Sequence, residues 1–132
     1  MQVVYADTSA VVKLVQPEAG SAALRAWLGA RRWVVSDLHR TELRRAALRT
    51  GVLADATLVR ADRLLAELDT IRLHGSVFDG AGRLEPAGLG SLDALHLAAA
   101  RTLGPDLAGL VAYDDRLIAA AGHHGITTWS PV

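Results

Sequence analysis

Short runs of β-branched and aromatic residues alternate along the chain with longer stretches in which apolar residues recur at helical spacing. The short runs predict strands at five places: Val3–Tyr5, Trp33–Val35, Thr70–Leu73, Leu110–Tyr113 and Ile126–Trp129. The stretches between them predict helices over Thr8–Val15, Ala19–Arg31, Leu38–Thr50, Asp55–Leu68, Leu92–Leu103 and Asp114–Ala121. Because parallel strands need helical crossovers, this order predicts an α/β layered fold with a central, mainly parallel sheet.

Glycine and proline mark the places where the regular pattern stops. The Gly104–Pro105 pair ends one predicted helix, and the glycine-rich segment Gly75–Gly90 is predicted to be a loop with at most one short helix near Val77–Leu84. Ser91 follows that loop and is predicted to cap the next helix. No internal repeat, low-complexity tract or linker interrupts the pattern, so we expect a single domain over residues 1–132.

Composition supports helices packed on a sheet and removes several classes of chemistry. Hydrophobic residues make up 51% of the 132 residues but aromatic residues only 5%, which favours Ala- and Leu-rich helices on a sheet over an all-β sandwich. The absence of cysteine excludes disulfides, thiol nucleophiles and zinc–thiolate sites. The sequence shows neither a signal peptide nor an apolar stretch of about 18 residues, so we expect a cytoplasmic protein without a membrane span.

Three acidic residues are expected at one edge of the sheet. Asp7 directly follows the first predicted strand, Asp114 directly follows the fourth, and Asp93 lies in the first turn of a predicted helix. The carboxyl ends of parallel strands share an edge, and ligands bind in the crevice there. The alternative is that each of these residues only caps a helix and complements its dipole.

Glu42 is a fourth candidate, because it lies inside a predicted helix on the same face as Leu38 and Ala46. An acid on an apolar face needs a partner, and the alternative is an ion pair with one of the nearby arginines. Four converging acids repel one another unless a cation lies among them, and oxygen ligands favour Mg²⁺ or Mn²⁺. Without metal, at least one of the four should have a raised pKa.

With these residues in place, the chain resembles the PIN-domain ribonucleases, and most closely the VapC-type toxins of bacterial toxin–antitoxin pairs. The resemblance covers nearly the whole chain and is carried by four segments in the right order: Val4–Ala10, Ser36–Leu43, Ser91–Ala98 and Val111–Leu117. It implies a PIN-like three-layer α/β/α fold with about five short strands. It also implies that the metal-binding acids of the family correspond to Asp7, Glu42, Asp93 and Asp114.

The resemblance assigns supporting positions as well, with one departure. Ser9 corresponds to the hydroxyl beside the first acid. Asp115 has no place in the resemblance and is predicted from its position to be a supporting acid at the start of a helix. Asp114 is preferred over Asp115 as the fourth metal acid because it comes at the strand end and begins an Asp-x-x-Leu spacing with Leu117. The family often has Thr two residues before that acid, where this chain has Ala112, so a supporting hydroxyl is absent.

The implied activity is that of a metal-dependent endoribonuclease, the toxin of a toxin–antitoxin pair. Such an enzyme hydrolyses RNA phosphodiester bonds with a water activated by metal that the acids hold. The implied partners are RNA, with tRNA or rRNA as candidates, a cognate VapB-like antitoxin and a second copy of the chain in a homodimer. Two alternatives stay open: a PIN-fold DNA nuclease, and a catalytically silent module that only binds a partner.

Charge adds a candidate surface for RNA. The chain has 14 basic and 14 acidic residues, yet seven arginines fall between Arg25 and Arg49 against only two acids. Arg40, Arg44 and Arg45 share the predicted helix of Glu42 and are predicted to bind the RNA backbone. The alternatives are a solvated helix face or an antitoxin-docking surface. None of the histidines is assigned a role, because a single histidine is more often a surface or core residue.

Overall fold

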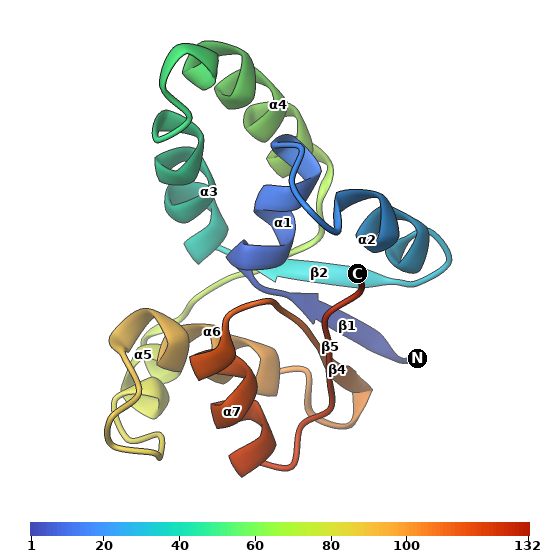
Figure 1. Cartoon of the computed structure of the whole chain (residues 1–132). Helices are drawn as coiled ribbons and strands as arrows, with labels where there is room; N and C mark the ends of the chain where they lie inside the picture. The colour runs from blue at the N-terminus through green and yellow to red at the C-terminus, as the bar shows by residue number, and fades with distance from the viewer.

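The computed structural model describes residues 1–132 and contains one parallel sheet of five strands. The strands are β1 (Val3–Ala6), β2 (Trp33–Ser36), β3 (Thr70–Ile71), β4 (Leu107–Val111) and β5 (Thr128–Trp129), and they lie in the order β3-β2-β1-β4-β5 (Figure 1). Every neighbouring pair is parallel, as the alternation of strands and helices predicts.

Helices cover both faces of the sheet and complete a three-layer α/β/α arrangement. In the orientation of Figure 1 the upper layer contains α1 (Thr8–Val15), α2 (Ser21–Leu28), α3 (Leu38–Leu48) and α4 (Ala54–Glu67). The lower layer contains α5 (Gly75–Ala81), α6 (Ser91–Arg101) and α7 (Asp115–His123). Two short 3₁₀ turns, η1 (Gly51–Leu53) and η2 (Gly104–Asp106), lie in the connections. The predicted α/β/α fold is confirmed.

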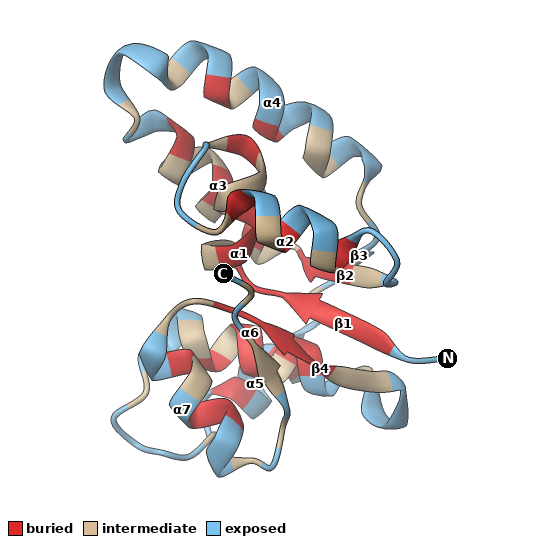
Figure 2. Ribbon diagram, turned by 45° about the vertical axis from the view of Figure 1, so that its right-hand side comes forward, coloured by how far each residue is buried: buried red, intermediate tan, exposed pale blue.

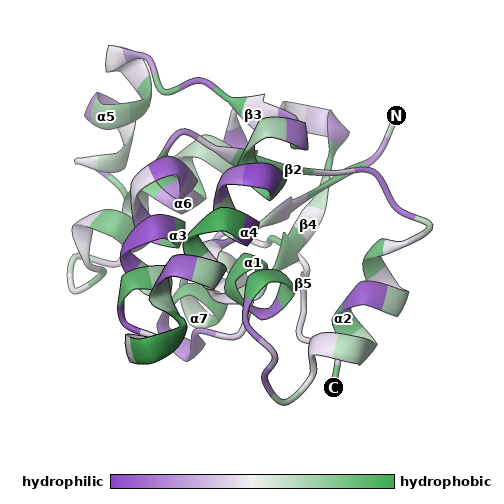
Figure 3. Cartoon of the chain, turned by 90° about the horizontal axis from the view of Figure 1, so that it is seen from above, coloured by the Kyte–Doolittle hydropathy of each residue, from purple (hydrophilic) through white to green (hydrophobic).

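The buried side chains form two apolar clusters, one on each face of the sheet. Along β1, Val3 and Tyr5 belong to the lower cluster with α6 and α7, whereas Val4 and Ala6 belong to the upper cluster with α1 to α4. This alternation is the period of two that any strand imposes. Figure 2 shows the inner strands in red as buried, and the connection between α3 and α4 as mostly exposed. Seen from above, α1 is mostly hydrophobic, while α3 carries long hydrophilic stretches (Figure 3).

Several strand boundaries and one helix cap differ from the sequence prediction. β4 begins at Leu107 rather than Leu110, because pairing with β1 extends residues of weak strand propensity. One of these residues is Gly109, where an added Cβ would lie 2.3 Å from the carbonyl oxygen of Thr127, so the residue before β5 approaches too closely for any side chain at this position. The predicted Ser91 cap is wrong, since Gly90 holds the cap position and no side chain bonds there.

The topology brings the polar ends of several elements to one edge. The arrowheads of β1 and β2 point toward the same side of the molecule, where α1 and α3 begin (Figure 1). β4 is parallel to β1, so α7 also starts at this edge.

None of the helices combines the length and the apolar character that crossing a membrane demands.

Candidate active site

Asp7 is the most buried acid at the carboxyl edge of the sheet. It caps α1 directly after β1, and only 4% of its surface is exposed. Its Oδ1 accepts hydrogen bonds from the Ser9 hydroxyl at 2.7 Å and from the backbone N–H of Ala10 at 3.3 Å, whereas Oδ2 has no partner in the protein. Burial raises the pKa of Asp7 to about 6, and the nearby charge of Asp114 acts in the same direction.

Ser9 joins the first acid to the strand that leads to the fourth. Its hydroxyl donates to Asp7 and accepts the backbone N–H of Tyr113 at 2.9 Å, although Tyr113 is 104 positions away in the sequence. The start of α1 and the end of β4 are therefore held together by the side chain that the resemblance assigns to this place. Ala112, where the family often has Thr, is fully buried.

Glu42 points from α3 toward the same edge, and its partner is a histidine rather than an arginine. Its Oε1 lies 2.5 Å from Nε2 of His96 and accepts the Thr8 hydroxyl at 3.1 Å, whereas Oε2 has no partner in the protein. No arginine forms an ion pair with Glu42, so the alternative of an Arg–Glu pair is wrong. Burial raises the pKa of Glu42, but the hydrogen bonds and charge of His96 outweigh that effect and lower it below its usual value.

Asp93 and Asp114 come from the lower layer and are less tightly held. Asp114 caps α7, and its Oδ1 accepts the backbone N–H groups of Arg116 and Leu117 at 2.9 and 3.3 Å. Asp93 lies in the first turn of α6, where burial and then the charge of Asp114 raise its pKa. Asp115, the first residue of α7, is exposed. The expectation that at least one of the acids has a raised pKa is confirmed for Asp7 and Asp93.

The four acids are neighbours but do not form a ready-made metal cage. Their charges act on one another, since Asp114 affects both Asp7 and Asp93, and Glu42 affects Asp93. However, no group of three or more acidic or histidine side chains lies close enough together to hold an ion. Binding of one ion by all four acids therefore requires side-chain rotation. Their chemistry suits a hard divalent cation, because each acid keeps at least one oxygen without a protein partner.

The arginines of α3 and of its C-cap, Arg49, face two different hollows. Arg45 and Arg49 line a cavity of about 690 Å³ together with Thr8, Glu42, Phe78 and Leu92. Arg40 and Arg44 line a separate hollow on the other side of the helix, where Nε of Arg44 lies 2.9 Å from Oδ1 of Asp62. Of the three arginines predicted to bind RNA, only Arg45 therefore shares a cavity with a candidate metal acid.

Comparison with known proteins agrees with this arrangement of acids around a parallel sheet. A family model described as the PIN domain matches residues 4–123. The chain belongs to the PIN-domain family. Among curated proteins, this PIN domain is similar to Ribonuclease VapC46 of Mycobacterium tuberculosis strain H37Rv, with 43% identity over 99% of both chains. No solved structure matches it significantly.

Two further relatives are VapC proteins as well. Ribonuclease VapC47 of M. tuberculosis strain CDC 1551 is 39% identical over 97% of this PIN domain and 96% of the relative. Ribonuclease VapC35 of M. tuberculosis strain H37Rv is 39% identical over 89% of both chains. Relatives of this similarity over nearly the full length place the chain among the VapC-type PIN domains.

Sequence reasoning left out three side chains that lie beside the acids of this PIN domain. Thr8 and His96 both contact Glu42, and the charge of Arg116 lowers the pKa of Asp93. His96 lies three residues after Asp93, which places it on a nearby helix face. Its partners, however, are 54 and 91 positions away in the sequence, so local spacing carries no signal for them.

Proposed function

We propose that this VapC-type PIN domain is an endoribonuclease that depends on Mg²⁺ or Mn²⁺ and hydrolyses phosphodiester bonds in RNA. The observation that carries the proposal is the set of four acids at one edge of the sheet, each with an oxygen that no protein group uses. The relatives that are named ribonucleases support the choice of RNA as substrate. The site residues of the proposal are Asp7, Glu42, Asp93 and Asp114 as metal ligands.

The charge balance of the site supports a metal cofactor. No Lys or Arg side chain forms an ion pair with any of the four acids, and only the contact of His96 with Glu42 and the charge of Arg116 near Asp93 offset part of their mutual repulsion. A divalent metal would neutralise this repulsion and would supply the chemistry that activates water and offsets charge on the phosphate. Without the metal, burial of Asp7 raises its pKa to about 6, which shows how poorly this carboxylate is solvated.

The residues around the acids have supporting tasks in this proposal. Ser9 fixes Oδ1 of Asp7 and leaves Oδ2 for the ion. Thr8 does the same for Oε1 of Glu42. Asp115 is exposed beside Asp114 and stays a predicted supporting residue through its charge at the start of α7.

The cavity beside Glu42 is the proposed path of the RNA. Arg45 and Arg49 supply positive charge for phosphates, while the half-exposed Phe78 and Leu92 offer apolar surface for bases. Arg40 and Arg44 stay predicted RNA contacts, but they lie outside this cavity. We also propose a VapB-like antitoxin and a homodimer as partners, and the cytoplasm as location, because the VapC relatives share nearly the full chain.

The test is cleavage of a single-stranded RNA by the purified chain, with a DNA of the same sequence in parallel. We expect RNA to be cut in Mn²⁺ or Mg²⁺, and to stay intact in EDTA or with the Asp7→Asn variant. Equal cleavage in all conditions contradicts the metal site, and preferred cleavage of the DNA contradicts the substrate. If calorimetry shows no uptake of Mn²⁺ and neither substrate is cut, the chain is a silent binding module.

A further inference from the structure

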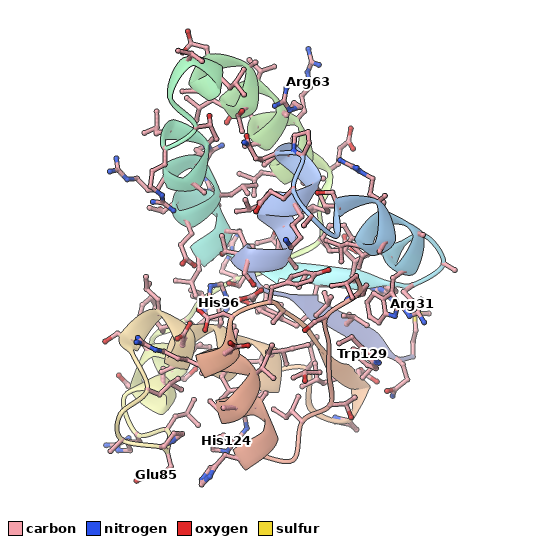
Figure 4. All side chains as sticks on the ribbon, in the orientation of Figure 1. Arg31, Arg63, Glu85, His96, His124 and Trp129 are labelled. Carbon is pink, nitrogen blue, oxygen red and sulfur yellow. The ribbon has the colours of Figure 1, made fainter.

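His96 is a buried imidazole that lies against a candidate metal acid. It belongs to α6 and is 2% exposed. Figure 4 shows it near the middle of the molecule, where the lower layer meets α1 and α3. Its side chain contacts Glu42 and Thr8 on one side and Tyr5 on the other, so it spans from the site to the core.

The contact between His96 and Glu42 fixes which nitrogen carries hydrogen. Nε2 of His96 lies 2.5 Å from Oε1 of Glu42, and a carboxylate oxygen only accepts hydrogen bonds, so Nε2 must donate. Thr8 donates its hydroxyl to the same oxygen at 3.1 Å. Oε1 of Glu42 is thereby engaged twice, while Oε2 stays free for another ligand.

The far side of the imidazole is held by a buried tyrosine. The hydroxyl of Tyr5 lies 2.7 Å from Nδ1 of His96 and 2.9 Å from Oγ of Ser36, and Tyr5 is fully buried. Nδ1 and the Tyr5 hydroxyl form one buried hydrogen bond, and the Tyr5 hydroxyl is itself hydrogen-bonded to Ser36. The ring of His96 cannot turn without breaking buried hydrogen bonds at both of its nitrogens.

We propose that His96 is a positioning residue of the metal site. With Tyr5 fixing its Nδ1, His96 holds Glu42 by Oε1 and presents Oε2 to the ion. The inference rests on the proposed function in one respect, namely that Glu42 is a metal ligand. Groups that hold a ligand without touching the metal change metal affinity or activity by roughly 10- to 100-fold when they are lost.

The second buried histidine of the site region shows what a purely structural histidine looks like here. Nε2 of His39 lies 2.7 Å from the carbonyl oxygen of Ala6, and Nδ1 accepts the backbone N–H of Ser36 at 3.1 Å. Both partners are backbone groups, so His39 connects β1 to the start of α3 and holds no acid. His96 differs because both of its close partners are side chains.

Two amide variants of His96, His96→Gln and His96→Asn, both replace the imidazole ring but place their N–H donor at different distances from the backbone. A Gln side chain reaches as far as Nε2 of His and can donate to Glu42, whereas an Asn side chain reaches only as far as Nδ1. We expect His96→Asn to bind Mn²⁺ roughly 10- to 100-fold more weakly than the wild type in calorimetry, and His96→Gln to recover most of that loss. RNA cleavage at limiting Mn²⁺ should follow the same order.

Removal of the tyrosine hydroxyl tests the same link with a milder change. We expect Tyr5→Phe to weaken Mn²⁺ binding about fivefold, which corresponds to one ordinary hydrogen bond. Tyr113→Phe is the matched control, because the Tyr113 hydroxyl bonds only the carbonyl oxygen of Pro131. It should leave Mn²⁺ affinity unchanged. If His96→Asn does not fold, the Tyr5→Phe result decides.

Equal Mn²⁺ affinity in the wild type and Tyr5→Phe, or in the wild type and a folded His96→Asn, overturns the positioning role. Asp7→Asn, measured alongside, distinguishes this failure from a failure of the proposed function. If Asp7→Asn loses Mn²⁺ binding and His96→Asn keeps it, only the role of His96 is wrong. If the wild type itself binds no Mn²⁺, both proposals are wrong.

Discussion

The acids above the sheet are fixed by side chains, whereas those below it are not. Ser9 holds Asp7, and Thr8 and His96 hold Glu42. Below the sheet, only backbone N–H groups hold Asp114, and no hydrogen bond holds Asp93. The upper half of the site is therefore set in place by the fold, while the lower half is free to adjust around a ligand.

The two upper acids also differ from each other in how the fold treats their charge. Burial disfavours the charged form of Asp7 and raises its pKa to about 6. Glu42 has a lowered pKa, because the hydrogen bonds and charge of His96 outweigh its burial. The fold therefore disfavours the negative charge of Asp7 and favours that of Glu42. This difference is expected if a bound cation compensates the charge of Asp7.

The largest expected effect is on catalysis. Asp7→Asn should lower RNA cleavage on the order of 10²- to 10³-fold, because loss of one ligand removes several kcal/mol of metal-dependent stabilisation. The measurement is single-turnover cleavage in Mn²⁺. Asp106→Asn is the control, since Asp106 is exposed at the opposite end of β4 and should have no effect. Unchanged cleavage by Asp7→Asn would show that Asp7 is not part of the catalytic site.

The next effect is on stability and on its dependence on pH. The pKa of Asp7 is about 6 in the folded chain and 3.8 in the unfolded chain. Protonation of Asp7 therefore contributes to the free energy of unfolding fully below about pH 4, and this contribution is lost as pH rises through 6. Asp7→Asn should therefore raise the unfolding free energy of the metal-free chain at pH 7 by up to about 3 kcal/mol. This gain should shrink toward pH 4.

Denaturant unfolding of the wild type and the variant at each pH gives this difference directly. The comparison is needed because the pKa of buried His39, lowered to about 4, gives the whole chain an opposite dependence below pH 6.5. Glu42→Gln is the contrasting variant. It should not gain stability at pH 7, because the fold favours the charge of Glu42. If both Asp7→Asn and Glu42→Gln gain stability at pH 7, the fold disfavours the charge of both acids and the contrast between them is wrong.

A smaller effect concerns the helix cap in the lower layer. Asp114→Ala should unfold about 1 kcal/mol more easily than Asp114→Asn, because Asn can still accept the N–H groups of Arg116 and Leu117. Both variants remove the charge, so the difference in denaturant unfolding reports the cap alone. Asp115→Ala should change stability by less than about 0.5 kcal/mol. If Asp115→Ala destabilises the chain more than Asp114→Ala does, Asp115 is the capping acid.

The smallest effect concerns RNA affinity. Arg45→Ala should weaken RNA binding and reduce the slope of log affinity against log salt by about 0.7, the value for one phosphate contact on a single strand. Arg44→Ala should change both less, because Arg44 is paired with Asp62 outside the cavity of Glu42. Fluorescence anisotropy with a labelled RNA in Ca²⁺ at several salt concentrations checks this. If Arg45→Ala and Arg44→Ala have equal slopes of log affinity against log salt, RNA does not bind in the cavity beside Glu42.

The order of the elements was predictable because each depends on local spacing. All five strands and the helices from α1 to α7 lie at or near the expected segments, and Asp114 caps α7 as expected. The errors fall where neighbours decide. Leu107–Gly109 is extended because it pairs with β1, and Gly90 rather than Ser91 occupies the helix boundary.

The sequence by itself determined the parallel α/β fold and the acids after the first and fourth strands, because strand period, helix period and position after a strand are local properties. Only the tertiary structure decided what each acid touches. It gave Glu42 a histidine rather than an arginine and separated Arg45 from Arg44. The reason is distance along the chain: His96 meets Tyr5 and Glu42 across 91 and 54 residues, and such meetings follow from packing of whole layers.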